Sequence, residues 1–535
     1  MENSTETDHS SVTKPASKVM LGGIFSLVGG LAVNVIVASI FGAGKEMDAY
    51  LTAFVIPTYF QTVIFWNLSF VLIPIFIEME VKDGEEKAWA LVGTFFWITV
   101  FILLVIALIG SFFSSSIINA IAPGFGEEKS ALAAQMLSIL MFTTPFAGLS
   151  TLTVGIQNAR NRFLWPALAP AIGFLINAIT LLIISSFVGP LALCWGYFAS
   201  MVVTSAITVI PVLLHVKTKV LPITDKRVKE IGKLVTPLIL FGMLISLSSL
   251  AERYFSSALP DGQIAYMGYA NKISNIFVNS LAFGIAAAIF PSMARTYTQE
   301  GIGGLSKKND FGLLLTLAVA LPVIMISGAV AVPLVSVFFE RGAFVHSDTL
   351  GVSKIVFAFL LGNVLFRMIH NIFQRSFYVL KDTITQPIID SIFVFLFIVT
   401  ARFFVIRWGY IGLVWATVAR SGLSVLLFWI LLLRRFPKDN LGKLFIKILK
   451  YIGAAIASYM SGHFIVQLLA FIPAIFQLAV SGLLSVVLYI VLLYFLDIEM
   501  LQSILELVGA RFFLNHLQKI RDLFFQRKPY LGRRS

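Results

Sequence analysis

Long, nearly uncharged apolar runs are the feature that most constrains this chain. A helix needs about 20 apolar residues to cross the hydrocarbon core of a bilayer, and such runs recur here, each ended by charged residues, Pro or Gly. A transmembrane β-barrel would instead alternate polar and apolar residues in segments of about ten. The sequence therefore predicts an all-α polytopic membrane protein with 14 transmembrane helices. The fourteen runs are 18–41, 48–77, 88–115, 131–157, 163–187, 190–215, 230–257, 264–294, 310–339, 349–379, 384–405, 409–433, 445–470 and 473–496.

Composition agrees with this prediction and excludes other classes of protein. Hydrophobic residues make up 58% of the 535 residues and charged residues only 13%, whereas a soluble chain has about 25% charged residues. A soluble enzyme, a DNA-binding protein and a disordered protein are thereby excluded. Cys194 is the single cysteine, so we expect neither an intrachain disulfide nor a cysteine metal site. The polar start of the chain predicts no cleavable signal peptide.

Basic residues are distributed unevenly between alternate loops. When the N-terminus is placed inside, more than two thirds of the 40 Lys and Arg residues fall on that side, with clusters at 217–233 and 434–447. Cytoplasmic loops of membrane proteins are enriched in Lys and Arg. We therefore expect both termini in the cytoplasm, and we attribute the net charge of +13 to these loops rather than to a nucleic-acid partner.

Basic and apolar residues interleave at helical spacing after Asp497. This pattern predicts that 498–535 forms an amphipathic helix on the anionic inner leaflet. A solvated helix used for solubility or for docking a partner is the alternative.

Two parts of the sequence repeat each other at a nearly constant spacing. The segment 189–196 (Gly-Pro-Leu-Ala-Leu-Cys-Trp-Gly) matches 409–416 (Gly-Tyr-Ile-Gly-Leu-Val-Trp-Ala) in Gly, Leu and Trp, and three weaker matches keep the same order. Because each copy holds six spans, both copies have the same orientation, a plan typical of transporters whose lobes rock around a central cavity. The predicted domains are a polar tail 1–17, an N-lobe 18–215, a basic cytoplasmic linker 216–229, a C-lobe 230–434, helices 13 and 14 at 435–497 and a basic tail 498–535.

Five short segments combine into a specific pattern. They are Ile-Phe-Gly-Ala-Gly at 40–44 with Asp48 shortly after, Ala-Pro-Gly-Phe at 122–125, Asn-Ala-Arg-Asn-Arg-Phe at 158–163, Phe-Glu-Arg-Gly-Ala-Phe at 339–344 and Phe-Tyr-Val-Leu-Lys-Asp-Thr at 377–383. With these segments, the chain from about residue 17 to about residue 500 resembles the MurJ/MviN-type lipid II flippases. That family belongs to the multidrug/oligosaccharidyl-lipid/polysaccharide superfamily.

The resemblance implies a transporter rather than an enzyme. Members of the family move undecaprenyl-diphosphate-linked glycans from the inner to the outer leaflet of the bacterial inner membrane. Helices 13 and 14 line a groove for the lipid tail, and cations line the central cavity, where they neutralise a diphosphate that is costly to bury unpaired. The implied cargo is lipid II or the repeat unit of an exported polysaccharide, with membrane lipids and envelope-synthesis enzymes as further partners. No cofactor is implied, and Na⁺, protons and the membrane potential are all open as driving forces.

Cations that the family usually carries in its first two helices are missing here. Leu27 and Val33 stand where arginines are usual, and Asn34 stands in place of an acidic residue. The segment 58–62 in the second helix is also neutral. The chain therefore uses other cations or carries a different cargo.

Charged and polar residues inside the predicted spans are the candidate site residues, because such residues in a membrane are functional hypotheses by default. Lys272 matches a cationic cavity position of the family. Asn271, Asn275 and Asn279 form a polar stripe that suits sugar hydroxyls or interhelical hydrogen bonds equally. The alternative for Arg253 is an ion pair with Glu252 or snorkelling, and that for Asp390 is a helix cap. The candidate cavity residues are Lys272, Arg253, Arg367, Arg375, Asn34, Gln61, Asn271, Asn275 and His370; Asp48 and Glu252 are gate candidates, Asp390 is a candidate cation site, and neither a metal site nor a catalytic residue is expected.

Three functions are compatible with these observations. A flippase for polyprenyl-diphosphate-linked oligosaccharide that works by alternating access is the leading hypothesis. A multidrug or cation antiporter of the same superfamily is the second, although helices 13 and 14 are extra for that branch. The third is a transport-inactive scaffold of the cell envelope, which the missing arginines would explain.

Overall fold

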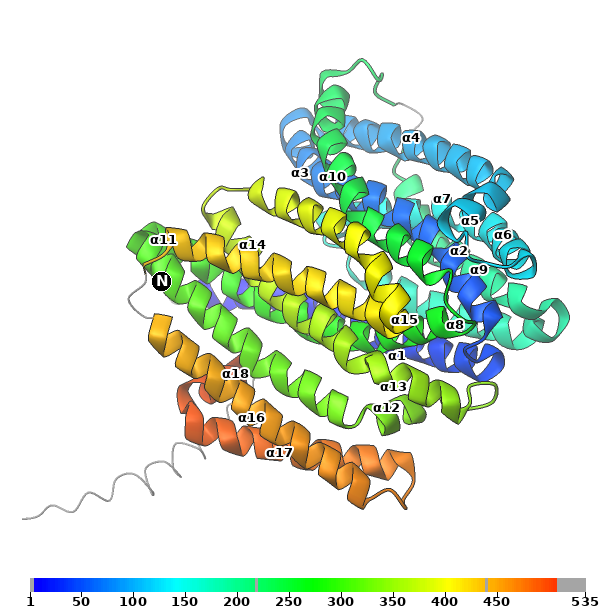
Figure 1. The fold of residues 1–535 in the computed structure, drawn as a ribbon. Coiled ribbons are helices and arrows are strands. Elements are labelled where there is room, and N and C mark those ends of the chain that lie inside the picture. Colours follow the sequence, from blue (N-terminus) through cyan, green and yellow to red (C-terminus); the bar gives the residue numbers. More distant parts are fainter. Residues whose placement is uncertain (1–3, 217–219, 438–440, 508–535) are drawn as a thin grey trace, which may run out of the picture. The chain divides into compact units, whose positions relative to one another are not determined.

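The computed structural model describes residues 4–216, 220–437 and 441–507, with side chains described in these ranges except at 4–21, 65–67, 70, 279–288 and 507. In these ranges every regular element is a helix (Figure 1). Helices are expected in lipid, because a backbone there must satisfy its own hydrogen bonds. The elements are α1 (Ser4–Phe41), α2 (Lys45–Phe60), η1 (Gln61–Phe65), α3 (Trp66–Asp83), α4 (Glu85–Phe112), α5 (Ser114–Ile121), α6 (Glu127–Met141), α7 (Thr143–Ala159), α8 (Leu164–Val188), η2 (Gly189–Leu191), α9 (Ala192–Leu213), α10 (Lys226–Ser256), α11 (Gln263–Ala329), α12 (Ala331–Phe339), α13 (His346–Leu360), η3 (Leu361–Phe366), α14 (Arg367–Val379), α15 (Thr385–Arg435), α16 (Leu441–Leu468), α17 (Ala474–Leu496) and α18 (Ile498–Leu507).

Ten helical stretches among the described residues are long and apolar enough to cross a membrane. The number is lower than fourteen because neighbouring predicted spans share one continuous stretch, and because the second predicted span is divided among α2, the π-helical turn η1 and α3. The all-helical membrane fold is confirmed. α1 begins at Ser4 and so takes in most of the predicted polar tail, whereas most of the predicted amphipathic tail, 508–535, lies outside the described residues. The predicted spans that share a stretch are 163–187 with 190–215 and 384–405 with 409–433. The spans 264–294 and most of 310–339 share α11, in which the counted stretch covers Ile289–Ala329.

Corresponding irregularities of the backbone recur in the two predicted copies. Gly189 and Gly409, 220 residues apart, both have positive φ (56° and 59°) and interrupt the helical stretches that contain them. Asn161 and Lys381, also 220 residues apart, are the two non-glycine residues with positive φ in the described part of the chain (58° and 60°). The break between α6 and α7 corresponds in position to η3. Because a left-handed residue other than glycine costs about 1–2 kcal/mol, this agreement supports a common backbone plan.

Two compact units divide the chain. The first contains Met1–Lys272, Phe338–Ile355 and Pro387–Arg420, and the second contains Ile273–Val337, Val356–Gln386 and Ser421–Ser535. The chain passes from one unit to the other within α11, α12, α13 and α15.

The core of the first unit contains the start of α10. Val228, Ile231 and Val235 of α10 are buried in a cluster with Leu72 and Phe76 of α3 and with apolar residues of α4. Spacing of three and four residues places these α10 side chains on one helix face. The first turns of α10 are therefore fixed against α3 and α4.

Charged side chains stabilise the same end of α10. Lys82 and Arg227 both bind Glu78, at 3.0 Å and 3.3 Å. These two cations, the nearer Lys82 foremost, lower the pKa of Glu78 below its ordinary value. Asp225 caps α10 by accepting a hydrogen bond from the backbone N–H of Arg227.

In the second unit α16 and α17 lie side by side (Figure 1). Tyr489 of α17 donates a hydrogen bond to the carbonyl oxygen of Ala318 in α11, at 2.9 Å. Directly after the end of α17, Asp497 accepts from Lys447 at 2.7 Å and from the Tyr451 hydroxyl at 2.7 Å. The last two long helices are thus held to α11 and to each other by polar groups at defined positions.

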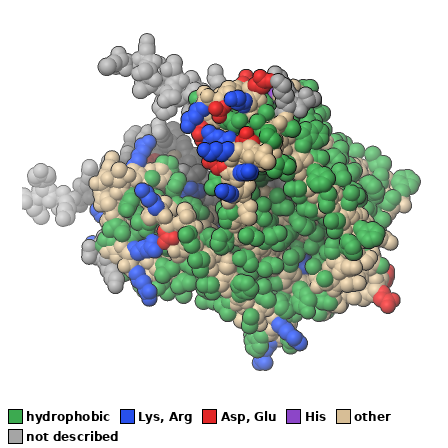
Figure 2. All heavy atoms as spheres, turned by 90° about the horizontal axis from the view of Figure 1, so that it is seen from above, with side chains coloured by type: hydrophobic (Ala, Val, Ile, Leu, Met, Phe, Trp, Pro, Cys, Tyr) green, Lys and Arg blue, Asp and Glu red, His purple; other side chains and the backbone are tan. Residues whose placement is uncertain are grey.

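Apolar side chains are widely exposed on the described surface. Phe101, Phe187, Val399 and Phe471 are between 70% and 83% exposed, and hydrophobic side chains cover broad areas of the face seen in Figure 2. Exposed apolar surface on this scale is unfavourable in water. It fits a chain whose surrounding solvent is lipid.

Candidate functional site

Asp48 is the most strongly held of the predicted site residues. Its side chain is fully buried in the first turn of α2. Its carboxylate accepts hydrogen bonds from the backbone N–H groups of Gly262 (2.8 Å) and Ala265 (2.7 Å), at the start of α11. The first N–H groups of a helix have no partner within that helix, and a negative charge there is favourable. Asp48 therefore caps α11 from another helix.

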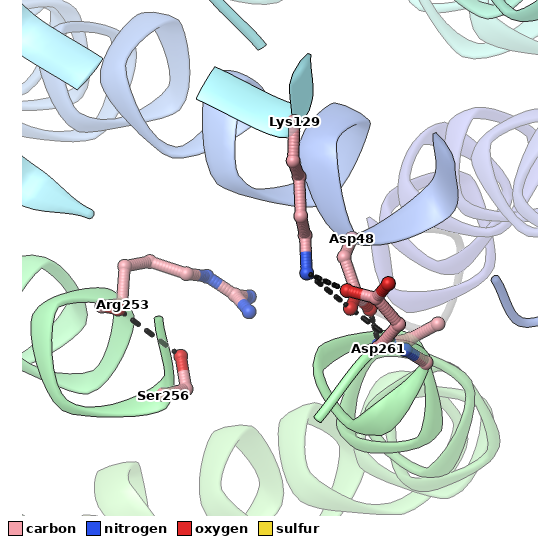
Figure 3. Close-up of polar contacts among 7 residues, drawn as sticks. Asp48, Lys129, Arg253, Ser256 and Asp261 are labelled. Atoms are coloured by element: carbon pink, nitrogen blue, oxygen red, sulfur yellow. Dashed lines mark hydrogen bonds and ion pairs between the residues drawn. The ribbon is translucent and has the colours of Figure 1, made fainter. Parts of the chain in front are cut away.

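Lys129 completes an ion-pair cluster with Asp48. Its Nζ lies 2.9 Å from Asp48 Oδ2 and 2.9 Å from Asp261 Oδ1, and Figure 3 shows it pointing between the two carboxylates. The side chain of Lys129 is 9% exposed and that of Asp261 is 64% exposed. We refer to Asp48, Lys129 and Asp261 as the Asp48 cluster. One of its two ion pairs is buried and the other is largely in contact with solvent.

The sequence predicted Asp48 as a gate residue but did not single out Lys129 or Asp261. Lys129 is 81 residues from Asp48 in sequence, and no local spacing joins the two. One feature of the sequence could have pointed to Lys129. It is one of the few basic residues in the loops that we expected to be poor in Lys and Arg.

Further contacts close the chain around the Asp48 cluster. The backbone N–H of Ala343 donates to the carbonyl oxygen of Ser39 at 2.8 Å, and the Tyr269 hydroxyl donates to the carbonyl oxygen of Gly42 at 2.8 Å. Phe339 and Phe344 pack on the Tyr269 ring. Segments of the predicted N-lobe and C-lobe are thus bound together at this end.

Arg253 lies on α10 near the same cluster. Its backbone carbonyl accepts a hydrogen bond from Ser256, and its guanidinium points toward the side where Lys129 lies (Figure 3). Its Nη1 is buried without a hydrogen-bond partner among the described residues. No ion pair with Glu252 is found among the described contacts, so the predicted alternative of a simple pair gains no support.

Glu252 and Asp390 share a neighbour. Both attract the positive charge of Arg420 in α15, and the Arg420 guanidinium lies 6.0 Å from the Phe397 ring centroid. The structure therefore brings a predicted gate residue and the predicted cation-site residue to one buried arginine. The sequence suggested no link among these three residues.

Lys272 is half-buried near the N-terminal part of α11. Its Nζ lies 5.0 Å from the centroid of the Tyr269 ring, a favourable cation–π contact. On the same helix Asn271 is half-buried and Asn275 is exposed, and the side chain of Asn279, the third member of the predicted stripe, lies outside the described residues. The stripe is thus partly accessible.

Three of the candidates in the second unit lie on α14. Arg367 is exposed directly after η3. The His370 ring packs edge-on against Phe428 at 5.0 Å, and the Arg375 guanidinium lies 5.0 Å from the Phe290 centroid. Arg367 thus presents its charge to the surroundings, whereas the other two pack on aromatic rings.

Asn34 and Gln61 remain in the first unit. Asn34 is half-buried in α1. Gln61, at the start of η1, lines a cavity of about 540 Å³. In the described part of the chain no group of three His, Cys, Asp or Glu side chains is placed to hold a metal ion.

Comparisons with known proteins agree with one another. The family model described as lipid II flippase MurJ matches residues 37–486. The probable lipid II flippase MurJ of Buchnera aphidicola subsp. Acyrthosiphon pisum is 29% identical over 72% of this chain and 76% of the relative. Its counterpart in Buchnera aphidicola subsp. Schizaphis graminum is 26% identical over 92% of this chain and 98% of the relative.

Solved structures show the same fold. A structure of lipid II flippase MurJ in an inward closed conformation superposes with a TM-score of 0.75, covering 89% of this chain and 98% of that one at 22% identity. An inward-facing multidrug resistance MATE transporter gives a TM-score of 0.62 at 16% identity, covering 76% of this chain and 94% of that one. The family match spans most of the sequence and includes every predicted site residue except Asn34. The chain belongs to the lipid II flippase MurJ family.

Proposed function

We propose that this chain moves lipid II, the lipid-linked peptidoglycan precursor, across the bacterial inner membrane. Membership of the MurJ family carries the proposal. The described helices, long and apolar enough for a membrane, support it. The polysaccharide repeat unit is the less favoured cargo, because the relatives named above are described as lipid II flippases.

The proposed architecture has fourteen spans in two six-helix lobes, with α16 and α17 as an added pair. The matching positive φ values of Gly189 and Gly409, and of Asn161 and Lys381, support the duplication. The domain boundaries are those predicted from the sequence. In this architecture α16 and α17 hold the lipid tail, so the prenyl chain never has to leave lipid.

The proposed orientation has both termini in the cytoplasm, which places the Asp48 cluster on the outer side. Transport by alternating access requires that one side be closed while the other is open. The bonds from Asp48 to Gly262, Ala265 and Lys129 close the outer side. The described conformation is then the one that receives cargo from the inner leaflet.

Lys272, Arg253, Arg367 and Arg375 are the proposed partners of the diphosphate. They compensate for the neutral residues at the start of the chain, where the family usually places arginines. The unpartnered Nη1 of Arg253 and the exposed position of Arg367 leave both groups available to an anion. Asp390 remains a candidate for cation coupling only in a state in which Arg420 has moved away.

Complementation tests the function directly. The gene is expressed in a host depleted of its own lipid II flippase, and growth and outer-leaflet lipid II are measured. We expect rescue by the native chain. Loss of rescue is expected when Lys272, Arg253 and Arg367 are changed together to Ala, whereas a matched triple variant of Lys45, Arg402 and Arg407 retains rescue.

Other outcomes separate the remaining hypotheses. A correctly inserted chain that fails to rescue, while its deletion in the native host accumulates a different lipid-linked glycan, would identify the polysaccharide cargo. A native chain that fails to rescue, and whose function in its own host is unchanged by the triple Ala substitution, would favour a scaffold over a transporter with a working cavity. Ion-coupled drug efflux without rescue would favour the antiporter.

A further inference from the structure

A cavity of about 540 Å³ lies within the first unit, away from the cations discussed above. It is lined by residues of η1, α3, α7, α8 and α9 and is partly open to the surroundings. Its volume falls within the range of about 300–1,000 Å³ typical of small-molecule sites. Six residues matter for its chemistry: Gln61, Ser150, Asn158, Phe174, Ser200 and Thr204.

Polar groups in the wall are available to a ligand. The side chains of Gln61, Asn158 and Ser200 make no hydrogen bond with another described residue, although Ser200 is only 2% exposed. The Ser150 hydroxyl lies 3.1 Å from that of Thr208 and keeps capacity for a further partner. Gln61 is half-buried and Asn158 is exposed, so their amide groups are accessible to a ligand that carries hydroxyl or amide groups.

Charge is absent from the wall, since none of the residues that line the cavity is Asp, Glu, Lys, Arg or His. A diphosphate placed there would be unpaired and strongly unfavourable. The rest of the wall is apolar, with Ile73, Val154, Phe174 and Met201 among its side chains. The cavity therefore suits an uncharged group that has both polar atoms and an apolar face.

Two glycines shape this wall. A Cβ on Gly173 would overlap with the Thr204 hydroxyl and lie 2.8 Å from the Ser200 hydroxyl. The absence of a side chain lets α8 approach α9 closely and leaves both hydroxyls at the cavity. A Cβ on Gly155 would lie 2.7 Å from Ile73 Cδ1, so α7 and α3 are also at their closest approach.

We propose that this cavity binds an N-acetylated sugar of the lipid-linked cargo while the diphosphate is held by the cations elsewhere. The inference rests on the proposed function and deepens it. Such a sugar carries hydroxyl groups for Ser150 and Ser200, an amide for Gln61 and Asn158, and an apolar ring face for Phe174. The cavity has room for a sugar fragment but not for a complete lipid-linked glycopeptide.

Binding of two lipids by the purified full-length chain in nanodiscs tests the proposal. The lipids are lipid II and undecaprenyl diphosphate, which has the same tail and a diphosphate but neither the sugars nor the peptide. V154F fills the cavity, and Q61L removes an amide with little change in size. Q135L and V188F place the same residues on exposed surface outside the cavity and serve as matched controls.

We expect V154F to weaken lipid II binding about tenfold, Q61L to weaken it severalfold, and both variants to bind undecaprenyl diphosphate as the native chain does. Equal weakening of both lipids, or no change for lipid II in either variant, would overturn the sugar site. If V154F fails to fold, which its melting temperature reports, Q61L alone decides. A native chain that binds neither lipid would overturn the proposed function instead.

Discussion

The backbone N–H of Ala265 donates a hydrogen bond of 2.7 Å to the buried carboxylate of Asp48, so a side chain of α2 holds the first turn of α11. The same carboxylate binds Lys129 of α6. Three segments far apart in the sequence therefore meet at one charged group. Contacts of Asp48, Lys129 and Gly342 at this end can be tested separately, as can the paired backbone positions Asn161 and Lys381 and the contacts of Asp497.

Replacing Asp48 by Asn should weaken the contacts that close the chain around the Asp48 cluster. The amide keeps one acceptor for the α11 backbone but loses the buried ion pair with Lys129, and breaking such a pair costs about 3–5 kcal/mol. Thiol labelling of a cysteine at buried position 43, in a chain whose Cys194 is replaced by Ser, measures the opening. We expect labelling to become at least tenfold faster.

Asp261→Asn is the matched control for that variant. Asp261 shares Lys129 with Asp48 but is 64% exposed, and exposed pairs contribute about 0–1 kcal/mol. Labelling should change less than fivefold. Equal effects of the two substitutions would show that burial of Asp48 is not what closes this end.

A double-mutant cycle should separate the two ion pairs of Lys129. Lys129→Met leaves Asp48 buried without its cation, so the variant should lose about 3–5 kcal/mol of stability. Combining it with Asp48→Leu should recover a large part of that loss, whereas combining it with Asp261→Leu should not. Denaturant unfolding of the detergent-solubilised chain gives the coupling free energies, and additivity in the Lys129–Asp48 cycle would contradict the prediction.

Gly342→Ala should destabilise the same end through the backbone. Gly342 has φ of 58°, and an added Cβ would overlap with the Ser39 carbonyl oxygen. A strained left-handed conformation costs about 1–3 kcal/mol, and the overlap adds to it. We expect a clear fall in melting temperature. Gly44→Ala, where φ is −105°, should have much less effect, and a similar fall at Gly44 would argue against backbone strain.

Lys381→Gly should stabilise the chain by about 1 kcal/mol. Lys381 adopts φ of 60°, a conformation that glycine reaches without cost. Asn161→Gly, at the corresponding position, should gain less, because Asn tolerates this conformation better than Lys. Melting temperatures of the two variants check the order, and a loss at Lys381 would reveal a role for its side chain.

Asp497 should make stability depend on pH in a narrow acidic range. Burial alone would raise the pKa of Asp497, but hydrogen bonds from Lys447 and Tyr451 lower this pKa below its ordinary value. A lowered pKa in the folded state gives stability that is present above the unfolded pKa, near 3.9, and lost as the pH falls through the folded pKa.

The free energy of unfolding of the native chain is compared with that of Asp497→Asn. We expect a difference of about 1–3 kcal/mol that is constant between about pH 7 and pH 5 and shrinks only below about pH 4. A difference that already shrinks near pH 6 would show that the pKa of Asp497 is raised. Glu506→Gln, a substitution in α18 away from these contacts, is the control.

Most of the helical fold could be predicted from the sequence, because apolar runs and their breaks are local properties. Gly189 lies between two predicted spans and Gly409 begins one, and both have positive φ in the structure. The contact of Lys272 with the ring of Tyr269, three residues earlier, also follows from helical spacing. Helix positions, helix breaks and contacts within one helix could therefore be predicted from the sequence.

The partners of the candidate residues could not be predicted in the same way. Nothing near Asp48 in the sequence indicates that Lys129 and the start of α11 bind it, because those contacts depend on how distant helices pack. Likewise, Asp390 read alone suggested a site for a bound cation, whereas the structure places Arg420 in its field. The packing of distant helices therefore determines which charged side chains pair with each other.

The Asp48 cluster also bears on leakage. A transporter with a large polar interior conducts ions whenever both ends open together. Because the closed end rests on a buried ion pair and on the N-terminus of a helix, rather than on an apolar plug, thermal opening leaves a carboxylate and two N–H groups unpaired at once. Brief, partial openings of this end are therefore costly, because the contacts of Asp48 with Lys129, Gly262 and Ala265 break together.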